Sequence, residues 1–253
     1  MRVAAVQLDC SGSKSEVVRR ALRMTRQAAD KAEVICLPEH WVPDAINNIE
    51  KVVEALAQIA TDTGAYIISG GEFTRRESAT MVESVLLGPK GEVGRQQKTH
   101  LFGREKRRAI PGNALFTFDA SGVKVGITIC HDLVYPEVSR ILALNGTEVL
   151  FAPARISSAG LKPWKLYVKV RALENRVPVV SPNVLQAPKF QGGSLIVGFT
   201  VGEKDRIVYP KVLASSGPRS QILVANLDLA TIRRHREERL RARRPEIYSD
   251  LLK

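Results

Sequence analysis

The chain has 253 residues, of which 44% are apolar and 25% are charged, a balance that is typical of a globular protein with one large core. The composition excludes a membrane-spanning protein, because no apolar run approaches the roughly 20 residues that cross a bilayer. The alternating start of the chain predicts a strand and not a signal peptide. Three cysteines without close spacing argue against a disulfide framework and favour a reducing cytoplasm.

The net charge of +12 and the isoelectric point near 9.9 raise the question of nucleic-acid binding. Much of the excess lies in residues 95–108 and in a helix-like run at residues 231–244. We interpret the excess as a solvated surface or a subunit contact, because the second run contains no aromatic side chain that would stack on bases. The positive charge also favours an acidic substrate by long-range attraction.

Strand and helix patterns alternate in the first part of the chain. A strand at residues 2–9 precedes a helix at 14–31, whose apolar residues share one face. Strands at 33–37 and 65–70 flank a second helix at 49–63. This β-α-β-α-β order predicts a layered α/β protein.

Two hairpins and a second alternating region follow. The first hairpin joins strands 80–87 and 93–98 through a Gly-Pro-x-Gly turn, and the second joins 115–118 and 123–129. The later elements are expected as helices at 136–144 and 164–175, strands at 148–151, 177–181, 194–201, 206–212 and 221–228, and a basic C-terminal helix.

No linker or change of composition divides these elements. We therefore expect one domain over residues 1–253, in which two sheets are flanked by helices as an α-β-β-α sandwich. The basic helix and tail, at about residues 229–253, are expected at a subunit interface.

Reactive side chains follow three of the predicted strands. Glu39, Lys98 and Cys130 each stand at or just past the end of a predicted strand. Because the carboxyl ends of strands open into ligand-binding crevices, these residues are candidates for a common site. A thiol nucleophile needs a base and a cationic donor for the oxyanion, and the glutamate and the lysine supply them. The N–H of His131 is a candidate second donor.

Considered alone, each of these residues has a structural explanation. A cysteine in an apolar strand is most often an inert small hydrophobe, and we interpret Cys10 and Cys36 in this way. A lone glutamate or lysine at a strand end is most often solvated. The three residues together favour a cysteine hydrolase.

The blocks around these residues resemble the signatures of the nitrilase superfamily, the carbon–nitrogen hydrolases. The resemblance covers Leu37-Pro38-Glu39, Lys98-Thr99-His100-Leu101-Phe102 and Cys130-His131-Asp132-Leu133-Val134-Tyr135-Pro136-Glu137, and it extends to Arg171–Arg176, Phe190–Ser194 and Arg243–Tyr248. It implies the α-β-β-α fold, a Glu-Lys-Cys triad, and homodimers or larger homo-oligomers.

The resemblance also suggests further site residues. A second catalytic glutamate is expected in the loop after the lysine block, where Glu105 stands; a solvent-exposed ion pair is the alternative. His131 replaces the aromatic residue that often follows the cysteine, and we expect it to form a pocket wall. Arg155 stands where relatives place substrate-lining residues, and it would bind a substrate carboxylate.

The expected function is hydrolysis of a non-peptide C–N bond in a small carboxamide, through a thioester on Cys130. Nitrilase and N-carbamoyl amino-acid hydrolase activities remain open, as does an inactive relative that binds nucleic acid or protein. No cofactor is expected, and no metal, since the cysteines and histidines show no CxxC or HExxH spacing. We expect no membrane association and no nucleic-acid partner.

Overall fold

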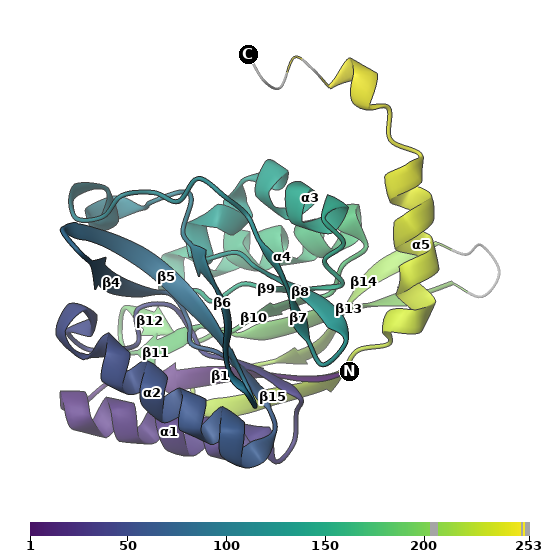
Figure 1. Cartoon of the computed structure of the whole chain (residues 1–253). Coiled ribbons are helices and arrows are strands. Elements are labelled where there is room, and N and C mark those ends of the chain that lie inside the picture. The colour runs from purple at the N-terminus through teal and green to yellow at the C-terminus, as the bar shows by residue number, and fades with distance from the viewer. Residues whose placement is uncertain (203–206, 249, 251–253) are drawn as a thin grey trace.

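The computed structural model describes residues 1–202, 207–248 and 250, and Figure 1 shows two sheets packed between helices. The strands of the larger sheet are β1 (Arg2–Asp9), β2 (Val34–Cys36), β3 (Tyr66–Ile68), β4 (Glu72–Arg76), β5 (Ala79–Gly88), β6 (Gly91–Gln97), β11 (Val184–Gln186), β12 (Phe190–Gln191) and β15 (Gln221–Asn226). Their order is β12-β11-β1-β2-β3-β5-β4, with β15 paired to β1 and β6 paired to β5.

The second sheet is built from later parts of the chain. Its strands are β7 (Thr117–Ala120), β8 (Val123–Ile127), β9 (Val149–Phe151), β10 (Val179–Ser181), β13 (Leu195–Val201) and β14 (Val208–Ser215). They lie in the order β14-β13-β10-β9-β8-β7, with β8, β9 and β10 parallel to one another.

Helices cover the outer face of each sheet. The α-helices are α1 (Lys14–Ala29), α2 (Ala45–Thr63), α3 (Pro136–Leu144), α4 (Leu161–Asn175) and α5 (Leu229–Arg241), and the short 3-10 helices are η1 (Gly103–Arg107), η2 (Cys130–Val134), η3 (Ser158–Gly160) and η4 (Pro245–Ile247). In Figure 1, α1 and α2 lie on the larger sheet, and α3 and α4 lie on the smaller one. The structure thus has the expected α-β-β-α layers.

Local sequence explains why these elements form where they do. The α1 helix begins at a capping box in which Ser13 and Glu16 bond to each other's backbone N–H, and it buries Val17, Ala21 and Met24. The central residues of β1 are buried on both faces, because this strand lies between a helix layer and the second sheet. The core therefore lies between the sheets and under the helices.

The observed bounds differ from the predicted ones at several ends. The second helix begins at Ala45, and the strand before the cysteine ends at Ile127, two residues earlier than predicted. The short strands β4, β11 and β12 were not predicted, because they are short or begin with polar residues. Of the predicted elements, Arg206 and the tail residues 249 and 251–253 lie outside the described residues.

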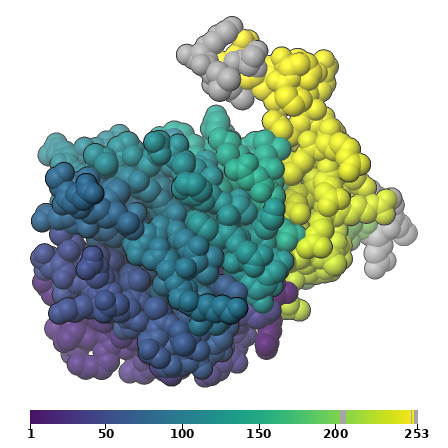
Figure 2. Space-filling model, viewed as in Figure 1, coloured from purple at the N-terminus to yellow at the C-terminus, as the bar shows by residue number. Residues whose placement is uncertain are grey.

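Helix α5 lies against the body, and the segment after it projects away from the globular part (Figure 2). Polar contacts anchor the inner side of helix α5 to the body. Arg233 Nη2 lies 2.6 Å from Glu148 Oε1, and Arg236 Nη1 donates to the carbonyl oxygen of Thr147 at 3.2 Å. Within the described chain, no helix combines the length and the apolar character needed to cross a bilayer.

Candidate active site

Glu39, Lys98 and Cys130 meet at the edge where the two sheets face each other. Glu39 follows β2 and Lys98 follows β6 in the larger sheet, whereas Cys130 follows β8 in the smaller one. All three are buried, with exposed fractions of 3%, 1% and 7%. The Nζ atom of Lys98 donates to Glu39 Oε1 at 2.7 Å. Two sheets therefore supply the three groups that the sequence predicted to act together.

Glu105 lies on the other side of the same ammonium group. Lys98 Nζ donates to Glu105 Oε1 at 2.8 Å, and the backbone N–H of Phe102 donates to Glu105 Oε2 at 2.7 Å. Glu105 is itself buried, with 4% of its surface exposed. The alternative of a solvent-exposed ion pair does not describe this residue.

The charges of these groups stabilise one another. Burial alone would lower the pKa of Lys98, but the carboxylates of Glu39 and Glu105 outweigh it and hold the pKa above its usual range. Burial alone would raise the pKa of Glu105, yet hydrogen bonds from His40 and Lys98 lower it to about 2. The lysine is thus a permanent cation, and Glu105 is a carboxylate at any moderate pH.

The thiol of Cys130 is protonated in the resting site. Burial raises its pKa well above the usual value, and the nearby Glu39 carboxylate raises it further, against the lowering effect of Lys98. A buried neutral thiol is not a nucleophile until a base removes its proton. The base must therefore act during attack, and Glu39 is in place to do so.

The backbone at Cys130 is held in an uncommon conformation. Its φ angle is +48°, in the left-handed region that costs a non-glycine residue about 1–3 kcal/mol. The Cys130 N–H donates to the carbonyl oxygen of Pro153 at 2.9 Å. The next N–H, that of His131, makes no hydrogen bond within the described part of the chain. It is therefore free to bind an oxyanion.

Buried side chains fix this strained turn. The Asp132 carboxylate accepts hydrogen bonds from the N–H groups of His100 (2.7 Å) and Ile129 (3.2 Å) and from Thr99 Oγ1 (2.8 Å), and so joins the lysine block to the cysteine block. Arg171 Nε, from α4, donates to the carbonyl oxygen of Leu133 at 2.9 Å. Asp132 and Arg171 both belong to the motif blocks, but the sequence pattern predicts no role for either residue.

A cavity of about 530 Å³ opens above these groups. Glu39, Lys98, Glu105 and Cys130 line it, and its walls include Phe102, His131, Val134, Trp164, Phe190, Arg104, Arg155 and Lys189. The size is suited to a small-molecule substrate, and the apolar side chains stand beside an unusually large number of charged groups.

His131 and Arg155 both line this cavity. The His131 ring lies 4.8 Å from the Phe102 ring, and burial together with the Lys98 charge lowers its pKa, so that it is a neutral pocket wall. Arg155 Nη1 donates to the His40 carbonyl oxygen at 2.7 Å, and Nη2 donates to Gln186 Oε1 at 2.6 Å. No carboxylate of a described residue lies within 4.0 Å of Arg155. Its charge is therefore held in place and not neutralised.

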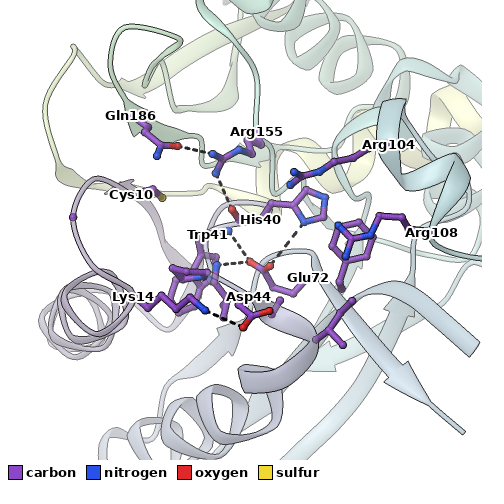
Figure 3. Close-up of a pocket in the computed structure, with 16 residues that line it drawn as sticks. Cys10, Lys14, His40, Trp41, Asp44, Glu72, Arg104, Arg108, Arg155 and Gln186 are labelled. Carbon is purple, nitrogen blue, oxygen red and sulfur yellow. Dashed lines mark hydrogen bonds and ion pairs between the residues drawn. The ribbon is translucent and has the colours of Figure 1, made fainter.

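A second cavity of about 410 Å³ adjoins the first and shares His40, Arg104 and Arg155 with it (Figure 3). Arg108 also lines it, and Lys14 forms an ion pair with Asp44 at 2.9 Å across its rim. Cys10 lies in its wall, and burial raises the pKa of this thiol to about 12. Cys10 is therefore unreactive, as the sequence indicated.

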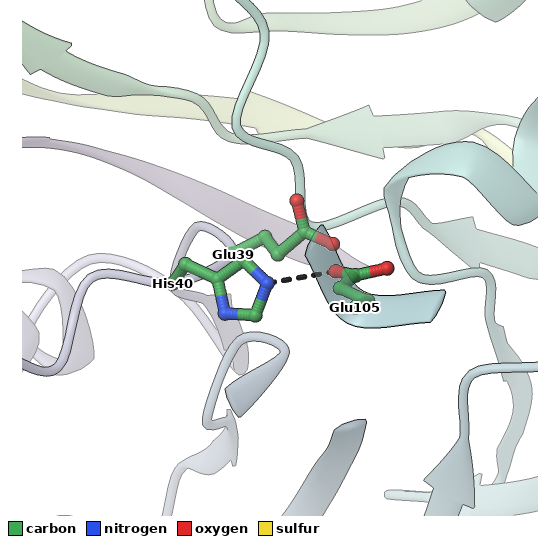
Figure 4. A group of neighbouring side chains, drawn as sticks. All are labelled: Glu39, His40 and Glu105. Atoms are coloured by element: carbon green, nitrogen blue, oxygen red, sulfur yellow. Dashed lines mark hydrogen bonds and ion pairs between the residues drawn. The ribbon is translucent and has the colours of Figure 1, made fainter. Parts of the chain in front are cut away.

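Glu39, His40 and Glu105 form a group with the composition of a metal site (Figure 4), with ligand atoms within 4.8 Å of one another. The ammonium of Lys98, however, contacts both carboxylates at 2.7 and 2.8 Å. A divalent cation at the same place would be repelled by this charge. The residues present therefore fit an internal ion-pair cluster better than a metal centre.

The sequence alone did not identify two residues that lie near Glu105, namely His40 and Glu72. His40 Nε2 lies 2.8 Å from Glu105 Oε1, and Glu72 lies behind the histidine. The histidine stands next to Glu39, so its position in the sequence was the only available signal. Glu72 gave no signal, because it begins a strand that was not predicted.

The fold and the cysteine-centred cluster define a class of hydrolase, and the comparisons with known proteins agree. A family model described as carbon-nitrogen hydrolase matches residues 2–237. The chain is 27% identical to omega-amidase NIT2 of Xenopus tropicalis, over 98% of this chain and 96% of that protein, and 35% identical to a nitrilase of Pyrococcus abyssi, over 76% and 72%. A carbon-nitrogen hydrolase structure from Helicobacter pylori G27 superposes with a TM-score of 0.89 at 23% identity, covering 100% of this chain and 98% of that one.

The chain therefore belongs to the carbon–nitrogen hydrolase family. The expected fold and reaction class are confirmed: the chain has the fold of this family and is a carbon–nitrogen hydrolase.

Proposed function

We propose that this enzyme hydrolyses a small, acidic carboxamide through a thioester on Cys130. The observation that carries the proposal is the buried Lys98 ammonium, held between the carboxylates of Glu39 and Glu105 beside a neutral thiol. This arrangement supplies a base, a fixed cation and a nucleophile in one cavity.

In the first half-reaction, Glu39 takes the thiol proton as Cys130 Sγ attacks the amide carbonyl carbon. The carbonyl oxygen becomes an oxyanion, which Lys98 and the N–H of His131 stabilise. Glu39 then gives its proton to the leaving nitrogen, the C–N bond breaks, and ammonia or an amine departs. The acyl group remains on the sulfur as a thioester.

In the second half-reaction, Glu39 acts again as a base. It removes a proton from water as the water oxygen attacks the thioester carbon, and the carbon–sulfur bond then breaks. Glu39 returns its proton to the departing sulfur, which leaves a carboxylic acid, the free thiol and the ionised base. Glu105 takes no part in proton transfer, because its pKa of about 2 keeps it ionised. Its role is to hold Lys98 in the orientation that the oxyanion needs.

The unneutralised cations of the cavity support an anionic substrate. Arg155, Arg104 and Lys189 line the cavity, whereas the charge of Lys98 is balanced by two carboxylates. A guanidinium with its fork of donors binds a carboxylate in two places. We assign the substrate carboxylate to Arg155, with His131 as the pocket wall. Relatives named omega-amidase are consistent with an amide substrate.

Nitrile hydrolysis is a second candidate, since one relative is named a nitrilase. The same thiol would add to a nitrile carbon and give a thioimidate in place of the tetrahedral amide adduct. An N-carbamoyl amino acid would react as an amide does, by attack of the thiol on the carbamoyl carbonyl carbon. These substrates differ in what the cavity binds and not in the Cys130 chemistry.

We also propose how the chain is organised. Residues 1–253 act as one domain, and α5 with the tail contacts a second copy in a homodimer or larger assembly. The projecting segment after α5 and its exposed Ile247 side chain support this assignment (Figure 1). The three free cysteines support a reducing cytoplasm.

The experiment is an ammonia-release assay over carboxamides with and without a terminal carboxylate, the corresponding nitriles, and N-carbamoyl amino acids. We expect turnover of the acidic carboxamides, loss of turnover in Cys130→Ala, and retention in Cys36→Ala, which removes a buried thiol outside the cavity. Mass spectrometry of the acid-quenched enzyme should detect the acyl adduct. Full activity of Cys130→Ala would show that another group is the nucleophile.

A further inference from the structure

His40 occupies a central position between the site residues of the two cavities. It directly follows Glu39 and has a φ angle of +48°, and the side chains of both residues point toward Glu105, with their polar atoms within 4.8 Å of one another (Figure 4). Its N–H donates to the carbonyl oxygen of Gly71 at 2.9 Å, and its own carbonyl oxygen accepts the Arg155 hydrogen bond at 2.7 Å. The backbone of His40 is therefore fixed on both sides.

The imidazole ring is fixed as firmly as the backbone. Nε2 lies 2.8 Å from Glu105 Oε1, and the ring stacks on Phe73 with a centroid distance of 4.9 Å and an interplanar angle of 19°. Only 11% of the side chain is exposed. Glu105 Oε1 also accepts the hydrogen bond from Lys98 Nζ, so this one oxygen atom joins the His40 ring to the ammonium group of the active site. Figure 4 shows how the His40 ring faces Glu105.

A second carboxylate faces the other nitrogen of the ring. Glu72 Oε1 accepts the N–H groups of Trp41 (2.7 Å) and Val42 (3.1 Å), whereas Oε2 is buried without a hydrogen bond among the described residues. The closest cationic partner of Oε2 is Nδ1 of His40, 3.9 Å away (Figure 3). A buried carboxylate oxygen without a hydrogen bond is costly unless a positive charge lies nearby. Burial raises the pKa of Glu72 and the His40 ring lowers it, so an ionised Glu72 goes together with a charged ring.

The local charge balance leads to the same result. Around His40 lie the carboxylates of Glu39, Glu72 and Glu105 and the cations of Lys98, Arg104, Arg108 and Arg155. Only Lys98 contacts any of these carboxylates, and Arg104 and Arg108 are exposed and screened by solvent. Lys98 and the half-buried Arg155 are therefore two cations against three buried acids, and one negative charge is left for the His40 ring to balance.

We propose that His40 is a cationic positioning residue, an imidazolium between Glu72 and Glu105 that keeps Glu105 ionised and oriented so that Glu105 holds Lys98 on the oxyanion. The proposal rests on the hydrolase mechanism above, because the orientation of Lys98 matters only if Lys98 stabilises that oxyanion. His40 touches no reacting atom and acts through Glu105.

The titration of the group agrees with this geometry. Burial alone would lower the pKa of His40, but the charge of Glu39 and the interactions with Glu105 and Glu72 outweigh it and raise the pKa from 6.5 to about 9. Since the folded value exceeds the unfolded one, the contribution of the imidazolium is complete below pH 6.5 and is lost as the pH rises through about 9.

The test combines a direct titration with kinetics on the full-length enzyme. The sequence has four histidines, so that the imidazole NMR signals of the wild type are few and the His40 signal is identified by its absence in His40→Gln. We expect this signal to titrate near pH 9, and the wild-type kcat to fall over the same range. In His40→Gln, kcat at pH 7.5 should fall by about ten- to a hundredfold with little change in KM, and the alkaline fall should disappear.

Two further variants separate charge from structure. Glu72→Gln removes a negative neighbour and should move the alkaline fall to lower pH by about one unit, with His40 still present. His235→Gln, the same substitution on α5, should leave the profile unchanged. The proposal is wrong if His40 titrates near 6.5 in the folded wild type, if Glu72→Gln does not move the alkaline fall, or if His40→Gln changes only KM. Failure of the hydrolase assignment is a separate result, in which the wild type releases no ammonia.

Discussion

The carboxylate of Asp132 accepts the backbone N–H of His100 at 2.7 Å, and this bond joins two blocks that are 32 residues apart in the chain. The same carboxylate accepts the N–H of Ile129, next to the nucleophile. A single buried side chain thus sets the distance between the lysine segment and the strained cysteine turn. We therefore expect catalysis to depend on this residue, although it does not line the substrate cavity.

We predict that Asp132→Asn lowers kcat by at least about tenfold and the free energy of unfolding by about 1–3 kcal/mol, because an amide cannot accept from all these N–H groups. Urea unfolding and steady-state kinetics measure the two effects. Asp62→Asn, on the exposed end of α2, is the matched control and should change neither. Wild-type kinetics in Asp132→Asn would contradict a positioning role.

Lys98→Met should abolish measurable turnover, since loss of one oxyanion donor alone costs about 10²- to 10³-fold in kcat. It should also destabilise the fold by about 3–5 kcal/mol at pH 7.5, because two buried carboxylates lose their common cation. Those carboxylates then bind protons more tightly in the folded state. The stability of the variant, measured by urea unfolding, should therefore recover as the pH falls, and a pH-independent deficit would contradict the ion-pair account.

The low pKa of Glu105 predicts that the protein loses stability in acid. Its folded pKa of about 2 lies below the ordinary value of 4.5, so its contribution is present above pH 4.5 and is lost as the pH falls toward 2. Unfolding free energies at pH 7, 4.5 and 3 should show this fall in the wild type and a smaller one in Glu105→Gln. Glu54→Gln, an exposed substitution on α2, should keep the wild-type slope. Equal slopes in all three proteins would show that Glu105 is not the linked group.

The sequence predicted the layers and the three main groups because both depend on local pattern. Predicted strands end at Glu39, Lys98 and Cys130, and the ends of strands in such a fold open into one crevice. The strand before the cysteine ends at Ile127, although the N–H groups of Thr128 and Cys130 still donate to the carbonyl oxygens of Phe151 and Pro153, and the left-handed turn comes at Cys130 itself. No periodicity predicts such a turn.

The supporting residues were not predictable for a different reason. Glu72 belongs to a strand whose residues Glu-Phe-Thr-Arg-Arg lack the apolar alternation that predicts a strand, and its burial is decided by packing against the segment after Glu39. Besides the charge of the adjacent Glu39, the charged state of His40 depends on contacts with Glu105 and Glu72, which lie 65 and 32 residues away along the chain. Such contacts are properties of the folded chain and leave no mark on local sequence.

Arg155 should distinguish acidic from neutral substrates. Arg155→Gln removes a charged donor worth about 1.5–3 kcal/mol to a bound carboxylate, so kcat/KM for the monoamide of a short dicarboxylic acid should fall by about ten- to a hundredfold. The uncharged amide of the same length should lose much less. Lys189→Gln, which removes an exposed charge at the rim of the same cavity, is the comparison and should have a smaller effect. If kcat/KM falls equally for both substrates, Arg155 does not bind the substrate carboxylate, and its role is to hold the His40 backbone.

The segment after α5 should determine the assembly. Ile247 has 58% of its surface exposed and ends η4, in the segment that follows α5 and projects from the body (Figure 2), so an exposed apolar side chain there favours contact with a second copy. Ile247→Asp would place a charge in that contact, and light scattering after gel filtration should show a smaller particle than the wild type at the same concentration. Val93→Asp, at an exposed apolar position on β6, is the control and should keep the wild-type mass. If both variants keep that mass, the segment does not hold the subunits together; if the wild type is itself a monomer, the interface assignment for α5 and the tail is wrong.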